Sequence, residues 1–385
     1  MEENKGRLEF VDILKGIAIL MVVIVHSSQK IVGMHDTIYK AAALGETGCQ
    51  LFFVLSGYLL TYSVNRKQIS LKEFYKKRWM SIAPPYYIAV VFWSVVGYLQ
   101  YRFQISGGFG YNGSIREILC NLFLLNGLFS EGNNNIVPGG WYIGALVILY
   151  ALYPLVHQIT VSLYRKSKVL LSGFYLVLYA VSEIAVYLNR TGRFTSLVLN
   201  ANCFLHQLSC LVMGISVFYV LRDYREMLVR HKKKAMTCMI LLLPLQITAY
   251  YCGTVPMRNF ASGLLFSSLF INCDLFSDRT VNCNISRKLK KMGQVSYEIY
   301  FIHFVFAWYI MPFIQRLIGN VMVSFAACDL YYVISICLCL PVMNLLASVY
   351  HRRWIEVRDR LHTFVIQCRR NVNRLHRENY DLRKE

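Results

Sequence analysis

The chain has 385 residues, of which 56% are hydrophobic and 16% are charged. This composition excludes an ordinary soluble globular domain, which carries more charge and fewer apolar residues. A formal net charge of +20 could indicate a nucleic-acid-binding protein. In this chain, however, the basic residues gather in alternate loops between apolar stretches. That placement is typical of a membrane protein, so we expect no nucleic-acid partner.

The apolar stretches define the expected fold. Each is about 20 residues long, which is enough to cross a hydrocarbon core of roughly 30 Å. They predict an all-α, polytopic membrane protein with about ten transmembrane helices, near residues 10–28, 44–64, 84–102, 141–163, 169–188, 202–221, 235–253, 259–276, 294–315 and 327–350. Loops 65–78, 164–168, 222–234 and 277–291 hold 20 Lys and Arg, and the intervening loops hold fewer than half as many. Both termini are therefore expected in the cytoplasm.

The first apolar stretch carries two ionisable side chains, Lys15 and His26. Positions eleven apart on an α-helix are about three turns apart, so the two lie within roughly 20° of one face and about 16 Å apart along the axis. Ionisable groups inside a membrane are costly, which makes a pair on one face a candidate functional site. The stretch lacks the small-residue cleavage site of a signal peptide, and we expect it to be retained.

The next segments add a motif and a basic run. The second stretch contains Phe52–Leu60, where Ser56 and Gly57 favour close helix approach over a nucleophilic role. Before the third stretch, Lys77 and Arg78 end a basic run that leads to Pro84 at the expected helix start. In the long external connection that follows, residues 115–128 have a helical apolar pattern and are expected to re-enter the membrane or lie on its surface.

Further candidate side chains lie in the fourth and ninth stretches. Trp141 is a candidate sugar-stacking residue, although aromatic belts at membrane interfaces explain most of the aromatic side chains. Tyr300 and His303 are three residues apart, and for His303 a structural, an acceptor-lining and a catalytic role all remain open. Glu298 is about 140° around the helix from His303, so the two are not expected to form an acid/base pair.

Residues 351–385 form a basic tail, which carries ten Lys and Arg and five acids after His351. Its apolar residues recur at three- and four-residue spacing, which predicts an amphipathic cytoplasmic helix resting on anionic lipid headgroups. An acidic protein partner is the alternative. We therefore divide the chain into a transmembrane domain, residues 1–350, and this tail. The twelve cysteines are scattered without metal-site spacing, so we expect small buried side chains and no metal.

Five local motifs occur in one order along the chain. They are Arg7 to Gly16 with His26; Phe52-Phe53-Val54-Leu55-Ser56-Gly57-Tyr58-Leu59-Leu60; Phe74-Tyr75-Lys76-Lys77-Arg78 with Pro84-Pro85-Tyr86-Tyr87; Pro138-Gly139-Gly140-Trp141 with Tyr150 and Pro154; and Gly293 to His303. Together they resemble the acyltransferase 3 family of membrane O-acyltransferases over nearly the whole chain. The resemblance implies transfer of an acyl group, usually acetyl from acetyl-CoA, to hydroxyls of surface polysaccharides, lipid-linked sugars or related glycoconjugates.

The resemblance also implies roles for particular residues. The hallmark of the family is a basic residue, ten intervening residues and a histidine on the first helix, which Lys15 and His26 match. Arg78 fits the first position of a basic pair at the third helix, whereas Ser81 stands where a second arginine is common. The acidic residue that many members place a few positions after the residue matched by Trp141 is absent from this chain.

The chemistry of the residues leads to the same candidate site. Acyl transfer to a sugar hydroxyl needs a base, and imidazole is the side chain with an ordinary pKa near neutrality, so His26 is the expected general base. Lys15 is about three turns nearer the cytoplasm and is expected to bind a phosphate of CoA or to stabilise charge at the thioester. Arg78 and Lys77 are the further expected phosphate contacts. The candidate substrate contacts are Ser56, Trp141, Tyr300 and His303.

We therefore expect a multi-pass acyltransferase of a cell membrane, with the bacterial plasma membrane as its expected location, an acyl-CoA donor and a glycan or glycolipid acceptor. Direct transfer with His26 as base fits best, and an acyl-histidine relay is the alternative mechanism. The alternative function is a transporter or flippase for a lipid-linked sugar, which an inverted repeat would favour, and we find no convincing repeat. A non-enzymatic membrane sensor is a third interpretation. No pattern specifies the oligomeric state.

Overall fold

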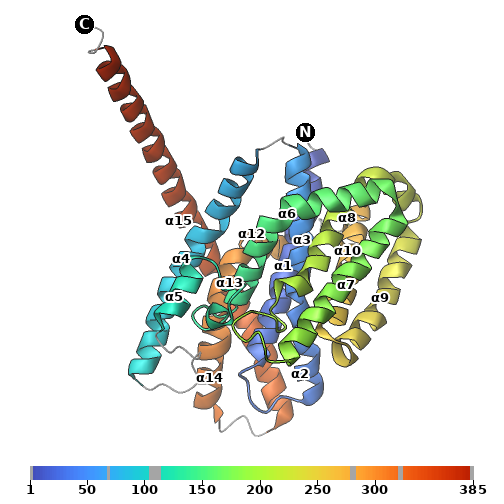
Figure 1. Ribbon diagram of the computed structural model, residues 1–385. Coiled ribbons are helices and arrows are strands. Elements are labelled where there is room, and N and C mark those ends of the chain that lie inside the picture. Colours follow the sequence, from blue (N-terminus) through green and yellow to red (C-terminus); the bar gives the residue numbers. More distant parts are fainter. Residues whose placement is uncertain (1–2, 67–69, 104–113, 278–282, 320–323, 382–385) are drawn as a thin grey trace.

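The computed structural model describes residues 3–66, 70–103, 114–277, 283–319 and 324–381. Within these ranges all regular secondary structure is helical, apart from one isolated bridge between Phe129 and Leu197. Figure 1 shows long helices gathered into one bundle, with the start of the first helix and the end of the last at the same end. The predicted all-α polytopic fold is confirmed, and the shared end agrees with the expectation that both termini lie on one side of the membrane.

In the part of the chain that the structure describes, nine helices of 19 residues or more, together with a composite ninth span, make up the bundle. The long helices are α1 (Glu3–Ser28), α3 (Gly48–Arg66), α4 (Leu71–Arg102), α6 (Gly140–Lys166), α7 (Lys168–Arg190), α8 (Phe204–Arg230), α9 (Lys232–Cys252), α10 (Val255–Leu275) and α15 (Phe325–Asp381). The short helix α2 (Asp36–Ala43) and the 3₁₀ turn η1 (Leu44–Thr47) connect α1 to α3.

Among the described residues, nine helices are long and apolar enough to cross a membrane. The tenth predicted span, near 259–276, is present as the 21-residue α10 but is less apolar than those nine. The reason is its place in the bundle, where it packs against α3, α8 and α9. Its polar side chains are paired there: Asn259 accepts from Gln50 at 3.1 Å, and Asp274 accepts from Arg225 at 3.0 Å.

Three predicted boundaries move. Helix α4 begins at Leu71 and runs through Pro84, so the basic run before that proline is helical and not part of a loop. Prolines are tolerated inside membrane helices because neighbouring groups satisfy the freed backbone. The predicted helical segment 115–128 is only α5 (Ile115–Leu122), because Leu124 adopts a left-handed φ of 58° that ends the helix.

The third shift is in the ninth span, 294–315, which is not one helix. It consists of the end of α12 (Asn284–Gln294), α13 (Ser296–Val305), a π-helical turn η3 (Phe306–Ile310) and α14 (Met311–Leu317). π-Helical turns inside helices are frequently found at functional sites. The turn begins two residues after Phe304 and three after His303 on this span.

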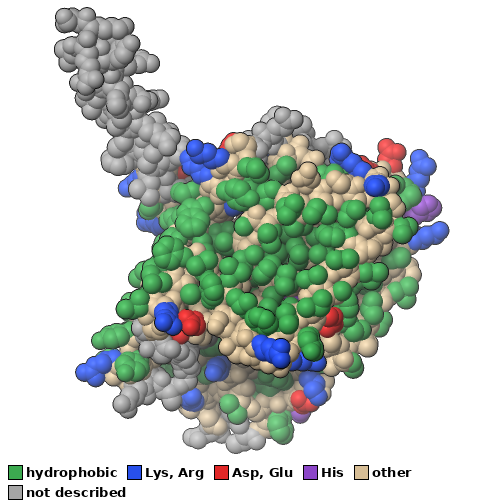
Figure 2. Space-filling view, in the orientation of Figure 1, with side chains coloured by type: hydrophobic (Ala, Val, Ile, Leu, Met, Phe, Trp, Pro, Cys, Tyr) green, Lys and Arg blue, Asp and Glu red, His purple; other side chains and the backbone are tan. Residues whose placement is uncertain are grey.

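The described part of the predicted tail, to Asp381, is helical and continues the last span without a break as α15, which projects beyond the bundle in Figure 1. Its contact with lipid headgroups stays a prediction. Figure 2 shows a broad band of hydrophobic side chains over the flank of the bundle, with most Lys and Arg toward its two ends. Such a band between charged ends is the surface expected of a protein in a bilayer.

Close glycine contacts hold the central helices together. Helix α1 packs against α3, α10, α12 and α13. A Cβ on Gly16 of α1 would lie 2.1 Å from the backbone oxygen of Leu289, and one on Gly293 of α12 would lie 1.7 Å from that of Asp12. Helices α3 and α8 meet in the same way, since a Cβ on Gly57 would lie 2.1 Å from a backbone oxygen of α8. The glycine in the Phe52–Leu60 motif thus permits close helix packing.

Candidate active site

The α1–α12 contact fixes the backbone around Lys15. The ammonium of Lys15 pairs with Asp12 Oδ1 at 3.0 Å, one turn earlier on α1, and its side chain is 29% exposed. An ammonium group has three N–H donors, so two remain after this pair. Lys15 is therefore oriented by Asp12 and still able to hold an anion.

A cavity of about 610 Å³ brings five predicted site residues together. Its walls come from α1, α3, α4, α6, α12, α13 and α15. The predicted residues that line it are Lys15, Ser56, Lys77, Arg78 and Tyr300. Ser81, which occupies the position where a second arginine is common in the family that the sequence resembles, lines the cavity as well. Residues from these seven helices thus form one chamber, and its volume is typical of small-molecule sites.

The guanidinium of Arg78 is held between two aromatic rings. Its Cζ lies 5.8 Å from the ring centroid of Phe74 and 5.9 Å from that of Tyr150. The Nε atom is buried, and it has no hydrogen-bond partner within the described ranges. A buried donor without a partner is costly unless a ligand or water accepts from it. Lys77 differs, because it is half-exposed and paired with Glu73 at 2.6 Å.

The predicted base, His26, lies beside a second histidine. The ring centroids of His26 and His303 are 5.2 Å apart, and Phe304 lies 4.5 Å from His26. His26 Nδ1 is 3.0 Å from Gln29 Oε1, and His303 Nδ1 is 3.2 Å from the carbonyl oxygen of Ile299.

These hydrogen bonds set the tautomers of both rings. A carbonyl oxygen only accepts, so each Nδ1 donates, and in the neutral form of each ring the lone pair is on Nε2. His303 Nε2 is buried and lacks a partner among the described residues. In their neutral forms the two neighbouring imidazoles therefore each have a basic Nε2.

Tyr300 joins the cavity to the histidine pair. It lines the cavity, and its ring centroid is 5.6 Å from that of His303, three residues along the same helix. Its hydroxyl donates to the carbonyl oxygen of Gly139 at 2.6 Å. Gly139 has a φ of 74°, and a Cβ there would lie 2.6 Å from the Tyr300 hydroxyl. The Pro138–Trp141 motif thus supplies the glycine that seats Tyr300.

Two predicted substrate contacts occupy less central places. Trp141 is not among the residues that line the cavity. It packs edge-on to Tyr142, which does line the cavity, with 6.1 Å between the ring centroids. Ser56 Oγ accepts from the Tyr150 hydroxyl at 3.3 Å inside the cavity. The structure thus brings Lys15, Ser56, Lys77, Arg78 and Tyr300 into the chamber, with His26 and His303 together beyond Tyr300.

One pair in the cavity wall was missed by the sequence reasoning. Glu298 of α13 is 8% exposed and forms an ion pair with His351 of α15. Both residues line the cavity, as do Trp354 and Ile355. Glu298 thus pairs with a residue of another helix. It does not pair with His303, and the helical phase of the two residues predicted this. No sequence pattern connects Glu298 to a histidine 53 positions later.

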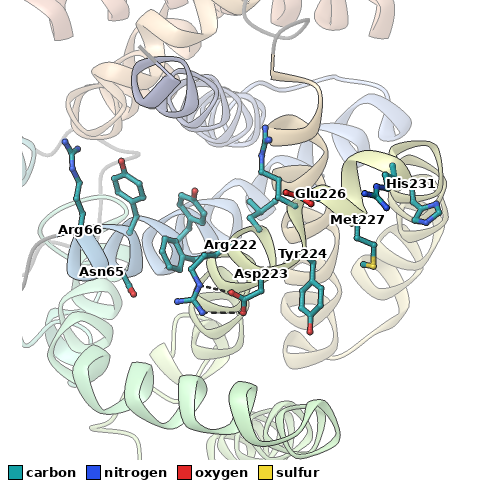
Figure 3. Close-up of a pocket in the computed structure, with 14 residues that line it drawn as sticks. Asn65, Arg66, Arg222, Asp223, Tyr224, Glu226, Met227 and His231 are labelled. Carbon is teal, nitrogen blue, oxygen red and sulfur yellow. Dashed lines mark hydrogen bonds and ion pairs between the residues drawn. The ribbon is translucent and has the colours of Figure 1, made fainter. Parts of the chain in front are cut away.

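A second cavity, of about 900 Å³, lies between the ends of α3 and α8 and is drawn in Figure 3. None of the predicted site residues lines it. Two of its four arginines have acidic partners: Arg222 pairs with Asp223 at 2.7 Å, as the figure shows, and Arg225 pairs with Asp274 at 3.0 Å. The smaller cavity, with its unpartnered Arg78 Nε and nearby histidines, is therefore the better candidate for chemistry.

The fold and this site define a class of multi-pass membrane proteins with a polar chamber that leads to a histidine pair. A family model described as an acyltransferase domain, Acyl_transf_3, matches residues 8–344 of the chain. The chain belongs to this family, and the protein is a membrane acyltransferase. No curated protein and no solved structure matches the chain significantly.

Proposed function

We propose that this acyltransferase takes an acyl group, in the simplest case acetyl, from cytoplasmic acyl-CoA and transfers it to a hydroxyl of a cell-surface glycan, exopolysaccharide or lipid-linked sugar. His26 is the general base. One observation carries the proposal: a single chamber joins the cations Lys15 and Arg78 to Tyr300, which contacts His303 beside His26. Transfer from CoA to a hydroxyl needs both a place for phosphates and a base.

The donor end of the proposed site rests on Arg78 and Lys15. The buried Nε of Arg78 lacks a partner among the described residues, and a phosphate oxygen would satisfy it. Lys15 retains two donors after its pair with Asp12. Lys77 is already paired with Glu73, so it contributes to the positive potential of the chamber and makes no specific contact with the donor. The helical spacing of about 16 Å between Lys15 and His26 suits a long carrier that is held by its phosphates at one end.

At the acceptor end His26 Nε2 takes the proton of the attacking hydroxyl. The hydroxyl oxygen forms a bond to the thioester carbonyl carbon, the carbon–sulfur bond breaks, and the sulfur leaves with the bonding electrons. His26 then returns its proton to the thiolate, so the products are the ester and the free thiol. His303 lies beside His26, and its Nε2 accepts from a neighbouring hydroxyl of the acceptor and so orients it.

The proposed orientation follows from the charge of the loops, and the proposed location follows from the family resemblance. The basic loops identify the Lys15 end of the bundle as cytoplasmic. The family resemblance to enzymes that modify cell-surface glycans supports a bacterial plasma membrane. The acceptor then approaches His26 from the outer half of the bilayer, and membrane lipids are the remaining partners.

The test uses purified protein in nanodiscs with acetyl-CoA and p-nitrophenyl glycosides as hydroxyl probes. We expect the protein to release free thiol and to form acetylated glycoside, which empty nanodiscs do not do. Intact acetyl-CoA in this assay, together with transport of a lipid-linked sugar by the protein in sealed lipid vesicles, would overturn the proposal in favour of a transporter. Labelled CoA distinguishes the mechanisms: exchange into acetyl-CoA without acceptor indicates an acyl-histidine relay, and its absence indicates direct transfer.

A further inference from the structure

The tail helix supplies part of the wall of the proposed donor chamber. His351, Trp354 and Ile355 line it, although all three lie beyond residue 344, where the family match ends. The family therefore assigns them no role. They lie near the end of the candidate membrane span Phe325–Val357 within α15.

An ion pair holds this part of α15 in place. Glu298 of α13 is nearly buried and pairs with His351, and α13 and α15 pack against each other. Residues three apart on a helix share a face, so Trp354 is presented to the same chamber about one turn nearer the cytoplasmic end. The indole is neither fully buried nor freely exposed.

Another part of the chamber wall has the chemistry of a phosphate site. Lys77, Arg78 and the small Ser81 of α4 line the same chamber as Trp354. A flat aromatic ring and cations in one chamber are the combination that binds a nucleotide, because the base stacks on the ring and the phosphates meet the cations. Lys15 is left for a further phosphate of the donor, and Tyr300 for its pantetheine and acyl parts.

We infer that Trp354 stacks on the purine base of the acyl-CoA donor and gives the enzyme its preference for a nucleotide-bearing thioester over a bare pantetheine thioester. This inference rests on the proposed function. Trp354 is a specificity residue for the donor. The Glu298–His351 pair is the positioning element that holds it there.

The test compares two donors in purified wild type, Trp354→Ala, Trp354→Phe and the exposed control Val357→Ala. The donors are acetyl-CoA and S-acetylpantetheine, which lacks the nucleotide. We expect Trp354→Ala to raise the KM for acetyl-CoA by about 5- to 150-fold, the range of one base–aromatic stack. The KM for S-acetylpantetheine should not change. Trp354→Phe should stay within about threefold of wild type because it keeps an aromatic face.

A second measurement covers the case in which Trp354→Ala does not fold. Adenosine 3′,5′-diphosphate is expected to quench tryptophan fluorescence in wild type, and the quench should largely disappear in Trp354→Phe although the nucleotide still inhibits. Equal loss with both donors would show a structural or interfacial role and overturn the inference, as would an unchanged KM for acetyl-CoA. A wild type that uses neither donor would instead remove the proposed function on which the inference rests.

Discussion

Replacing Gly293 by alanine is expected to force α12 away from α1. A Cβ at this position would lie 1.7 Å from the backbone oxygen of Asp12, whereas ordinary contact begins at 3.4 Å, so the two backbones must part by about 1.7 Å. The position of a Cβ is fixed by the backbone and the atom it meets is a backbone oxygen, so no side-chain rotation relieves the clash. Overpacking costs about 1–3 kcal/mol, and we expect the upper end of that range. The better helix propensity of alanine returns at most about 1 kcal/mol, which leaves a net loss of about 2 kcal/mol.

The matched control is Gly173→Ala in α7, where an added Cβ has no heavy atom within 4 Å. Here only the propensity acts, and we expect stability to stay the same or rise by up to about 1 kcal/mol. Both variants are compared with wild type by unfolding in mixed micelles of increasing SDS content. The reasoning is refuted if Gly293→Ala is as stable as wild type, or if Gly173→Ala is destabilised equally.

Three further predictions concern the chamber. Arg78→Lys keeps the charge but loses the planar group held between two rings, so the KM for acetyl-CoA should rise about tenfold with little change in kcat; an unchanged KM would remove Arg78 from the donor site. His303→Asn should lower kcat by about 10²-fold and leave donor binding unchanged, because the Nε2 lone pair is lost beside His26; equal effects on binding and rate would indicate a packing role. Glu298→Ala should cost about 1 kcal/mol in SDS unfolding, because His351 is partly exposed and solvent screens the pair, and adding His351→Ala should cost little more; two fully additive losses would show that the residues are not coupled.

The hydropathy of the chain was enough to predict the bundle. Most spans are continuous apolar helices whose length alone identifies them, and the phase of Lys15 and His26 follows from one helical period. The boundaries were harder. Pro84 was taken as a helix start, but α4 continues through it, since a membrane helix tolerates proline where neighbours satisfy the backbone. The left-handed φ of Leu124, just after α5, could not be predicted from a leucine side chain.

The site was predictable only in part, because it is assembled from distant segments. Lys15, Arg78 and Tyr300 were found from motifs, and the structure brings them into one chamber. The contact of His26 with His303 depends on α13 lying against α1, which local patterns in one sequence do not encode. The wall formed by Trp354 depends in the same way on how α15 leaves the bundle.

The central claim is that His26 removes the proton from the acceptor hydroxyl. The most direct measurement is acetyl transfer from acetyl-CoA to a p-nitrophenyl glycoside by purified wild type, His26→Ala and the exposed control His231→Ala, with the Kd for CoA measured in each. We predict a fall in kcat of about 10²- to 10⁴-fold for His26→Ala, an unchanged Kd for CoA and a wild-type rate for His231→Ala. A folded His26→Ala variant that transfers acetyl at the wild-type rate would contradict the account.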